Sequence, residues 1–328
     1  MIRNGTRMIP AGSLRAAVIV GVLWATRVTA GEPAGSAFQP FLRQIWEDAV
    51  QNVRGILGHF AQFNLLSLFM LCAWSCIVIV IIMIARKYDR TRMQWGVAAS
   101  YVAGGLGSCL CALLYNGYLF NATGVMYQAG AYDYDGIVIG LVSASVGEEF
   151  WKLAAGAVVT VVLLGQRRNV GDHGRILGFV VIGCTFATAE NMITYASELS
   201  QSEMLMRAVT AVPLHACMGV VHGKGVNAAL RPGRRLPFLP LILAFVVAAF
   251  FHALYNTSQY LLAWLLSRLD ISETWPSLIA DLPPGFVVGP IVFVLTLWAW
   301  NTWRNLPETT ADPALQPGED LDWVDTEW

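Results

Sequence analysis

The sequence predicts an all-α protein embedded in a membrane, with about seven transmembrane helices, or eight if an N-terminal signal is retained. Of its 328 residues, 56% are hydrophobic and only 13% are charged, whereas soluble domains carry about a quarter charged residues. Long apolar runs of membrane-spanning length recur along the chain, and basic loops alternate with acidic or uncharged ones. No basic patch is interleaved with aromatic residues, so we expect contact with a lipid bilayer and none with nucleic acid.

The N-terminal region predicts export of the segment that follows it. Residues 1–30 contain several arginines, then a short apolar core, then small residues suited to cleavage, which is typical of a signal peptide. An uncleaved signal anchor is the alternative, and both place the next residues outside the cytoplasm. Residues 31–63 repeat apolar side chains at helical spacing between polar ones, which predicts an amphipathic extracytoplasmic segment at the membrane surface.

Residues 64–303 form the predicted multi-span core. Hydropathy and length place seven spans at approximately 64–85, 95–119, 137–164, 176–197, 207–230, 237–266 and 286–303. The basic loops "RKYDRTR", "GQRRNV" and "RPGRR" all fall on one side of the membrane, and "YDYDG" and "LDISETWPS" fall on the other. The positive-inside rule therefore predicts a cytoplasmic C-terminus. The last residues, 304–328, are acidic and proline-rich, which predicts a disordered cytoplasmic tail.

Four of the predicted spans contain ionisable or amide side chains. Such residues are costly within a bilayer and mark functional sites. They comprise Glu148, Glu149 and Lys152 in the third span, Glu190 and Asn191 in the fourth, His215 and His222 in the fifth, and His252 and Asn256 in the sixth. Counting about 1.5 Å per residue from the span ends places them at overlapping depths. The pattern therefore predicts one buried polar site shared by four helices.

Helical spacing indicates which of these side chains share a face. Lys152 is four residues from Glu148 and three from Glu149, so the three can meet. His252 and Asn256 are also four residues apart. Glu148 and Lys152 alone could be a structural ion pair, and the asparagines could be hydrogen-bonding contacts between helices. We expect His222, near the cytoplasmic end of its span, to be an interface residue.

Four motifs follow one another on consecutive spans and resemble a known family. They are "EEFWK" (EExxK), "FATAEN" (FxxxEN), "HACMG" (HxxxG) and "HALYN" (HxxxN). In this order they resemble the PrsW family of intramembrane proteases, which is related to the CAAX-processing and bacteriocin-protection (CPBP) membrane proteases. The resemblance covers roughly residues 65–300. It implies proteolysis of a membrane-embedded protein substrate such as an anti-sigma factor, in the inner, cytoplasmic membrane of a bacterium.

The candidate catalytic residues are Glu148, Glu149, His215, His252 and Asn256. Two adjacent carboxylates in a low-dielectric medium resist joint ionisation, so one should hold a proton unless a cation compensates. We expect Glu149, together with Glu148, to activate a water molecule for attack on the peptide carbonyl.

The remaining polar residues have supporting roles in this hypothesis. His252 and Asn256 would stabilise the oxyanion or the leaving group. Lys152 would tune the glutamates, and Glu190 would orient His215 or His252. Asn191, next to Glu190, completes the supporting set.

The sequence leaves the cofactor and the function class open. We expect a metal-free glutamate route, because the chain lacks the paired histidines of an HExxH helix. Zinc bound by Glu149, His215 and His252 is the alternative, since two histidines and a glutamate make an acceptable catalytic set. A proton-coupled transporter is the alternative function, and a non-catalytic receptor or scaffold is a third. Convergence of Glu149, His215 and His252 within hydrogen-bond or one-water reach around a cavity would favour the protease.

Overall fold

The computed structural model describes six stretches of the chain and a few isolated residues. The stretches are 95–123, 134–166, 171–195, 201–231, 238–269 and 289–305, and the isolated residues are Ala73, Trp74, Ile77, Ile79 and Leu236. The predicted signal, the 31–63 segment, nearly all of the first span and the tail beyond residue 305 lie outside the described residues.

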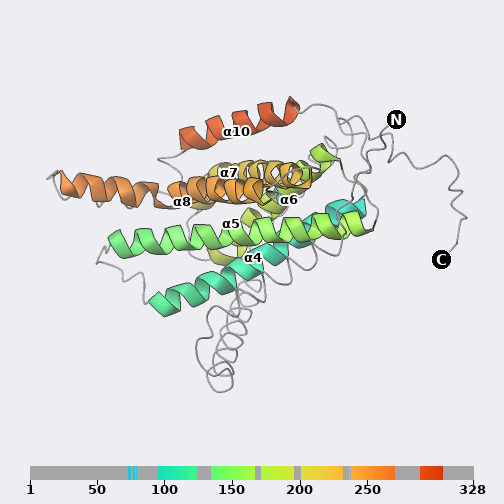
Figure 1. Ribbon diagram of the computed structural model, residues 1–328. Coiled ribbons are helices and arrows are strands. Elements are labelled where there is room, and N and C mark those ends of the chain that lie inside the picture. The colour runs from blue at the N-terminus through green and yellow to red at the C-terminus, as the bar shows by residue number, and fades with distance from the viewer. Residues whose placement is uncertain are drawn as a thin grey trace, which may run out of the picture.

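The described stretches are helical, as the sequence predicts (Figure 1). The elements are α4 (Trp95–Thr123), α5 (Tyr134–Gly165), α6 (Asp172–Glu190), the π-helix η1 (Asn191–Tyr195), α7 (Gln201–Leu230), α8 (Leu239–Arg268) and α10 (Gly289–Arg304). Each corresponds to one predicted span, and η1 continues α6. The apolar runs end where charged or turn-forming loops begin, which explains why hydropathy located the helices well.

Three of the described helices are long and apolar enough to cross a membrane. These segments are Trp95–Leu119, Asp172–Thr194 and Leu239–Leu266. Helices α5 and α7 are long enough but not apolar enough. Helix α5 carries two glutamates and a lysine, and α7 carries several polar and charged residues. The seven predicted spans are therefore supported in part. Helices α5 and α7 are less apolar because they carry much of the polar site.

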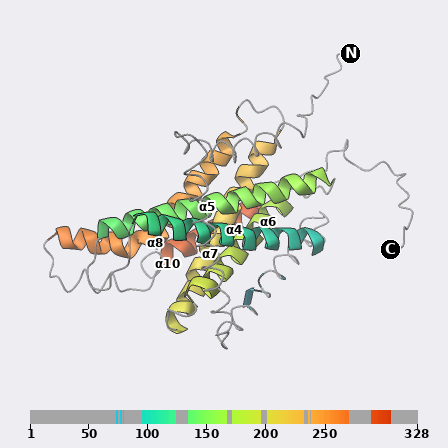
Figure 2. The ribbon, with the colours of Figure 1, turned by 90° about the horizontal axis from the view of Figure 1, so that it is seen from below.

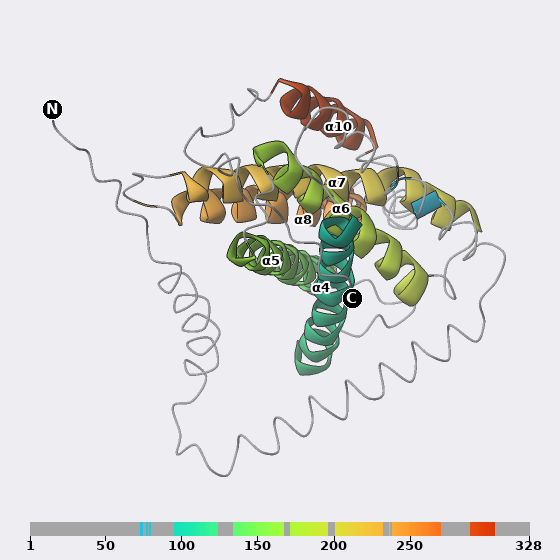
Figure 3. The same ribbon diagram turned by 90° about the vertical axis from the view of Figure 1, so that its right-hand side faces the viewer.

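Five helices close into a ring. Helix α4 packs against α5, α5 against α8, α8 against α7, α7 against α6, and α6 returns to α4. Figures 1 and 3 show this order, with α4 and α5 on one side of the α6–α7–α8 group and α10 outside α7 on the other. Side chains that point inward from any of the five helices therefore meet inside the ring.

The α6–α7 pair is the tightest contact in the ring, and glycine makes it possible. A Cβ atom on Gly219 would lie 2.5 Å from the carbonyl oxygen of Phe179, and one on Gly223 would lie 2.6 Å from Cα of Ile176. A Cβ on Gly183 would clash with the backbone of His215. Helix α6 is buried along nearly its whole length, and α4 and α5 cross this pair (Figure 2). The close approach brings the end of α6 next to the histidine of α7.

A polar staple joins the start of α6 to the end of α7. Arg175 Nε donates a hydrogen bond to Asn227 Oδ1 at 2.5 Å, and the same guanidinium pairs with Asp172. Asn227 Nδ2 donates to the carbonyl oxygen of Asp172 at 2.8 Å. These contacts satisfy charged groups at the helix ends and fix the relative position of the two helices.

Candidate active site

The site begins on α5, where two glutamates and a lysine occupy one helical turn. All three side chains are buried, and Glu149 is 0% exposed. Lys152 Nζ pairs with Glu149 Oε1, three residues earlier, and Glu148 turns to a different partner. The spacing in the sequence allowed Lys152 to pair with either Glu148 or Glu149. The contacts of each glutamate with the other helices of the ring distinguish them.

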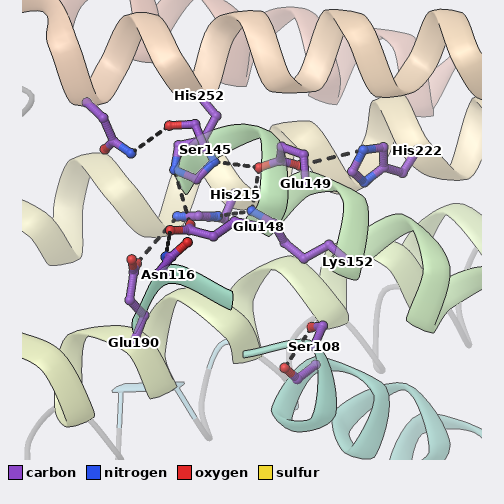
Figure 4. A network of polar contacts seen from close by, with 12 residues as sticks. Ser108, Asn116, Ser145, Glu148, Glu149, Lys152, Glu190, His215, His222 and His252 are labelled. Atoms are coloured by element: carbon purple, nitrogen blue, oxygen red, sulfur yellow. Dashed lines mark hydrogen bonds and ion pairs between the residues drawn. The ribbon is translucent and has the colours of Figure 1, made fainter. Parts of the chain in front are cut away.

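Glu149 links α5 to α7 and α8. Its Oε1 accepts a hydrogen bond from His252 Nδ1 at 2.7 Å in addition to the contact with Lys152. Its Oε2 lies 3.6 Å from His222 Nε2. Glu149 Oε2 and His222 Nε2 have no hydrogen-bond partner among the described residues. Figure 4 shows His252 and His222 on either side of this carboxylate.

Glu148 links α5 to α4 and α8. Asn116 Nδ2 on α4 donates to Glu148 Oε1 at 3.0 Å. The other oxygen, Oε2, lies 3.5 Å from His252 Nε2, which is an ion-pair distance without hydrogen-bond geometry. His252 therefore faces one glutamate with each ring nitrogen. This arrangement fixes the imidazole between the two carboxylates.

His215 completes the cluster from α7. Its Nδ1 lies 2.6 Å from Lys152 Nζ, and its Nε2 lies 3.8 Å from Glu190 Oε2 at the end of α6. The rings of His215 and His252 meet edge to face with their centroids 4.7 Å apart. Figure 4 shows these side chains converging from four helices. Glu149, His215 and His252 therefore lie in one cluster, with Glu149 hydrogen-bonded to His252 and joined to His215 through Lys152.

The two asparagines singled out by the sequence connect helices. Asn256 Nδ2 on α8 donates to Ser145 Oγ on α5 at 3.0 Å, one turn before the glutamates. Asn191 Oδ1 accepts from Arg207 Nε on α7 at 2.7 Å. Asn256 is half-buried at the edge of the cluster, and Asn191 is fully buried behind Glu190. Both make the interhelical contacts that amides form within membranes.

The structure also adds residues that sequence reasoning missed or misplaced. Asn116 and Arg207 contact the glutamates directly and were not predicted. Each is an isolated polar residue in a predicted span, a signal that could have found them. His222 was predicted to be an interface residue. It is 1% exposed and faces Glu149 instead, because the depth along a helix does not reveal which neighbour a side chain meets.

The cluster has the composition of a metal site. Glu148, His215 and His252 each offer one ligand atom, and these three atoms lie within 4.8 Å of one another. Two imidazoles and a carboxylate form a catalytic zinc set of known type. This set contains Glu148, whereas the sequence analysis assigned Glu149 to the metal alternative.

Buried charge also favours a cation here. Glu148, Glu149 and Glu190 are three buried carboxylates, and the buried cations of the cluster are Lys152 and Arg207. Glu148 Oε2 and Glu149 Oε2 have no hydrogen-bond partner among the described residues. Unpaired carboxylate oxygens are costly away from water. The residues present therefore fit a divalent metal ion.

A ring of apolar helices around a buried carboxylate–histidine cluster is an arrangement that suits an intramembrane hydrolytic enzyme. Residues 92–280, more than half of the chain, match the family described as "PrsW family intramembrane metalloprotease". The chain belongs to this family and is an integral membrane peptidase. No curated protein and no solved structure matches it.

The family membership decides between the alternatives left open by the sequence. The family resemblance is confirmed, and the protease is supported over the transporter and the scaffold. The description as metalloproteases supports a metal-dependent route, and not the metal-free route that the sequence analysis preferred.

Proposed function

We propose that the protein hydrolyses a peptide bond in or next to the membrane span of a protein substrate, at the cluster enclosed by α5, α6, α7 and α8. The observation that carries this proposal is the convergence of Glu148, His215 and His252 beside Glu149. All four side chains are buried within apolar helices. A membrane-embedded substrate is the class of protein that can reach such a site.

Glu148, His215 and His252 would hold a divalent ion such as zinc. When bound, such an ion acidifies a coordinated water molecule and polarises the scissile carbonyl. The carboxylate of Glu149 holds His252 through Nδ1 at 2.7 Å, which directs Nε2 toward Glu148. Carboxylates that anchor a ligand histidine in this way fix its tautomer and orientation. Asn116 holds Glu148 by its Oε1 and leaves Oε2 facing the histidine.

Glu149 is also the residue placed to move a proton. Its Oε1 is occupied by Lys152 and His252, so Oε2 is the atom that can accept a proton from the attacking water. That proton would then pass to the leaving amine, as general acid–base catalysis requires. Lys152 balances the negative charge of Glu149 and contacts Nδ1 of His215, which keeps the two sides of the cluster together.

Asn256 would bind the peptide group. Its amide is held by Ser145 on α5 at 3.0 Å, and one amide hydrogen remains for a substrate carbonyl or oxyanion. Asn256 is half-buried, at the margin of the buried cluster. By resemblance, the substrate would be an anti-sigma-factor-like membrane protein in a bacterial cytoplasmic membrane. The distribution of basic loops would place the enzyme's C-terminus in the cytoplasm.

The test is reconstitution of the full chain in liposomes with candidate single-span proteins. Cleavage should be abolished in Glu149→Ala and His252→Ala and weakened in Asn256→Ala. An Arg175→Gln variant, altered at the staple outside the cluster, should retain cleavage. Undiminished cleavage by Glu149→Ala would refute the proposed base. Cleavage that persists in Glu149→Ala, in His252→Ala and in Asn256→Ala would refute the site.

A further inference from the structure

Arg207 is a buried arginine that the proposed function leaves unused. It lies on α7, eight residues before His215, and its side chain is 4% exposed. A guanidinium cannot be neutralised by losing a proton, so burial requires partners that hold its charge. Nε donates to Asn191 Oδ1 at 2.7 Å, and Nη2 donates to Glu190 Oε2 at 3.3 Å. One guanidinium therefore binds two consecutive side chains.

Those two side chains mark the point where α6 changes its helical form. Glu190 is the last residue of α6, and Asn191 is the first of η1. Single π-turns inside α-helices occur frequently at functional sites. The planar fork of Arg207 holds both side chains from the neighbouring helix, and a point charge could not reproduce that geometry. The junction between α6 and η1 is thereby fixed to α7.

Glu190 lies between Arg207 and His215. Glu190 Oε2 lies 3.3 Å from Arg207 and 3.8 Å from His215 Nε2. The second distance is too long for a hydrogen bond. Since Nδ1 of His215 contacts Lys152, Nε2 is the nitrogen left to bind a metal. Glu190 would compete for that nitrogen if Arg207 did not hold it back.

We propose that Arg207 is a positioning residue that restrains Glu190 and so keeps His215 Nε2 available as a metal ligand. This inference rests on the proposed function. It extends the site by a residue that touches neither the metal ligands nor the substrate. Removing one member of a buried ion pair leaves an uncompensated buried charge, and the other ion-pair partner of Glu190 Oε2 among the described residues is His215 Nε2 at 3.8 Å. Without Arg207, Glu190 would bind His215 and weaken metal binding.

The experiment measures Co²⁺ binding to the full chain in detergent, from the visible absorption of the bound ion, without any substrate. Arg207→Gln should weaken Co²⁺ binding by about tenfold, at the lower end of the loss seen when outer partners of ligand histidines are removed. In a Glu190→Gln background the same change should have little effect, because no carboxylate remains to compete. Arg207→Lys should fall between wild type and Arg207→Gln, because the charge is kept and the fork is lost.

Arg175→Gln is the matched control. Arg175 also joins α6 to α7, but at the opposite ends of the helices and away from the cluster. It should lower the thermal stability and leave Co²⁺ affinity unchanged. If Arg207→Gln does not fold, the comparison uses Arg207→Lys in both Glu190 backgrounds.

Two results separate this inference from the proposed function. Wild-type affinity in Arg207→Gln, or an equal loss in both Glu190 backgrounds, would overturn the role of Arg207 alone. Failure of the wild-type chain to bind Co²⁺ would overturn the metal assignment and this inference together. A loss of affinity confined to the background with Glu190 would support the restraint.

Discussion

Glu149 holds the cluster together at the scale of single residues. It contacts Lys152 and His252 through Oε1 and faces His222 through Oε2. Glu148 instead contacts Asn116 through Oε1 and faces His252 through Oε2. The roles of Glu148 and Glu149 therefore differ because their partners differ, although they are neighbours in the chain.

Glu149→Gln should reduce cleavage by about 10²–10⁴-fold, because an amide cannot accept a proton from water. The amide can still accept a hydrogen bond from His252, so the loss should appear in kcat more than in KM. Single-turnover cleavage in liposomes measures this. Glu148→Gln is the paired variant and should lower Co²⁺ affinity as well. If Glu149→Gln bound Co²⁺ more weakly but kept its kcat at saturating Co²⁺, Glu149 would be the metal ligand and Glu148 the proton acceptor.

His222→Phe should leave thermal stability unchanged or raise it, while lowering cleavage, because His222 Nε2 faces Oε2 of the proposed base, Glu149. The reason is that His222 Nε2 and Glu149 Oε2 are buried without hydrogen-bond partners among the described residues, and an unsatisfied buried polar atom costs about 1–3 kcal/mol. Phenylalanine has a similar shape and removes one such atom. Thermal unfolding in detergent, measured beside cleavage, tests this. A large fall in stability would show that His222 has an essential partner.

At the scale of secondary-structure elements, the close contact of α6 and α7 determines the geometry of the site. Gly219 and Gly223 of α7 face the backbone of α6, and no side chain would fit between the two helices at these positions. That distance sets how near the end of α6 comes to His215, and therefore how near Glu190 comes to the cluster. The packing of two apolar helices thus determines the geometry of polar groups.

Gly219→Ala should destabilise the protein by about 1–3 kcal/mol, the usual cost of overpacking. A Cβ at this position would lie 2.5 Å from the carbonyl oxygen of Phe179, and the backbone cannot yield as a side chain could. Gly107→Ala on α4 is the control, because its Cβ would meet nothing within 4 Å. It should be neutral or slightly stabilising. Equal effects of both changes on the unfolding temperature would contradict this account of the contact.

The sequence predicted the helices better than it predicted the contacts between them. Apolar runs located α4 to α8 and α10 because lipid requires continuous hydrophobic helices. The motifs located the residues of the cluster. They could not decide whether Lys152 pairs with Glu148 or Glu149, because both lie on one helical face. That choice is made by Asn116 and His252, which come from helices distant in the chain.

At the scale of the whole molecule, the enzyme is a ring of helices with its polar groups inside. The five helices each contribute an inward polar side chain, and the carboxylates exceed the cations among the buried residues described. A ring of this kind excludes bulk water from the cluster, which strengthens the electrostatic interactions within it. The catalytic groups therefore depend on the assembly of all five helices.

Chelation should abolish cleavage, and added Zn²⁺ should restore it. The reason is that Glu148, His215 and His252 would hold an ion that no other cluster of the described residues is placed to bind. The measurement is cleavage in liposomes after incubation with a membrane-permeant chelator, followed by stepwise addition of Zn²⁺. A chelator that cannot enter the membrane should act more slowly. Full activity after complete metal removal would return the metal-free glutamate route to first place.

The polar turn on α5 also affects how the protein enters the membrane. A charged residue at the centre of a span costs about 2.5–3.5 kcal/mol during insertion, and α5 carries three such residues within five positions. Helix α5 should therefore insert poorly by itself, and efficiently only when α4 accompanies it with Asn116 facing Glu148. The order of biosynthesis matches this requirement, because α4 is made first. On this account we expect assembly of the active site to begin while the chain is still being made.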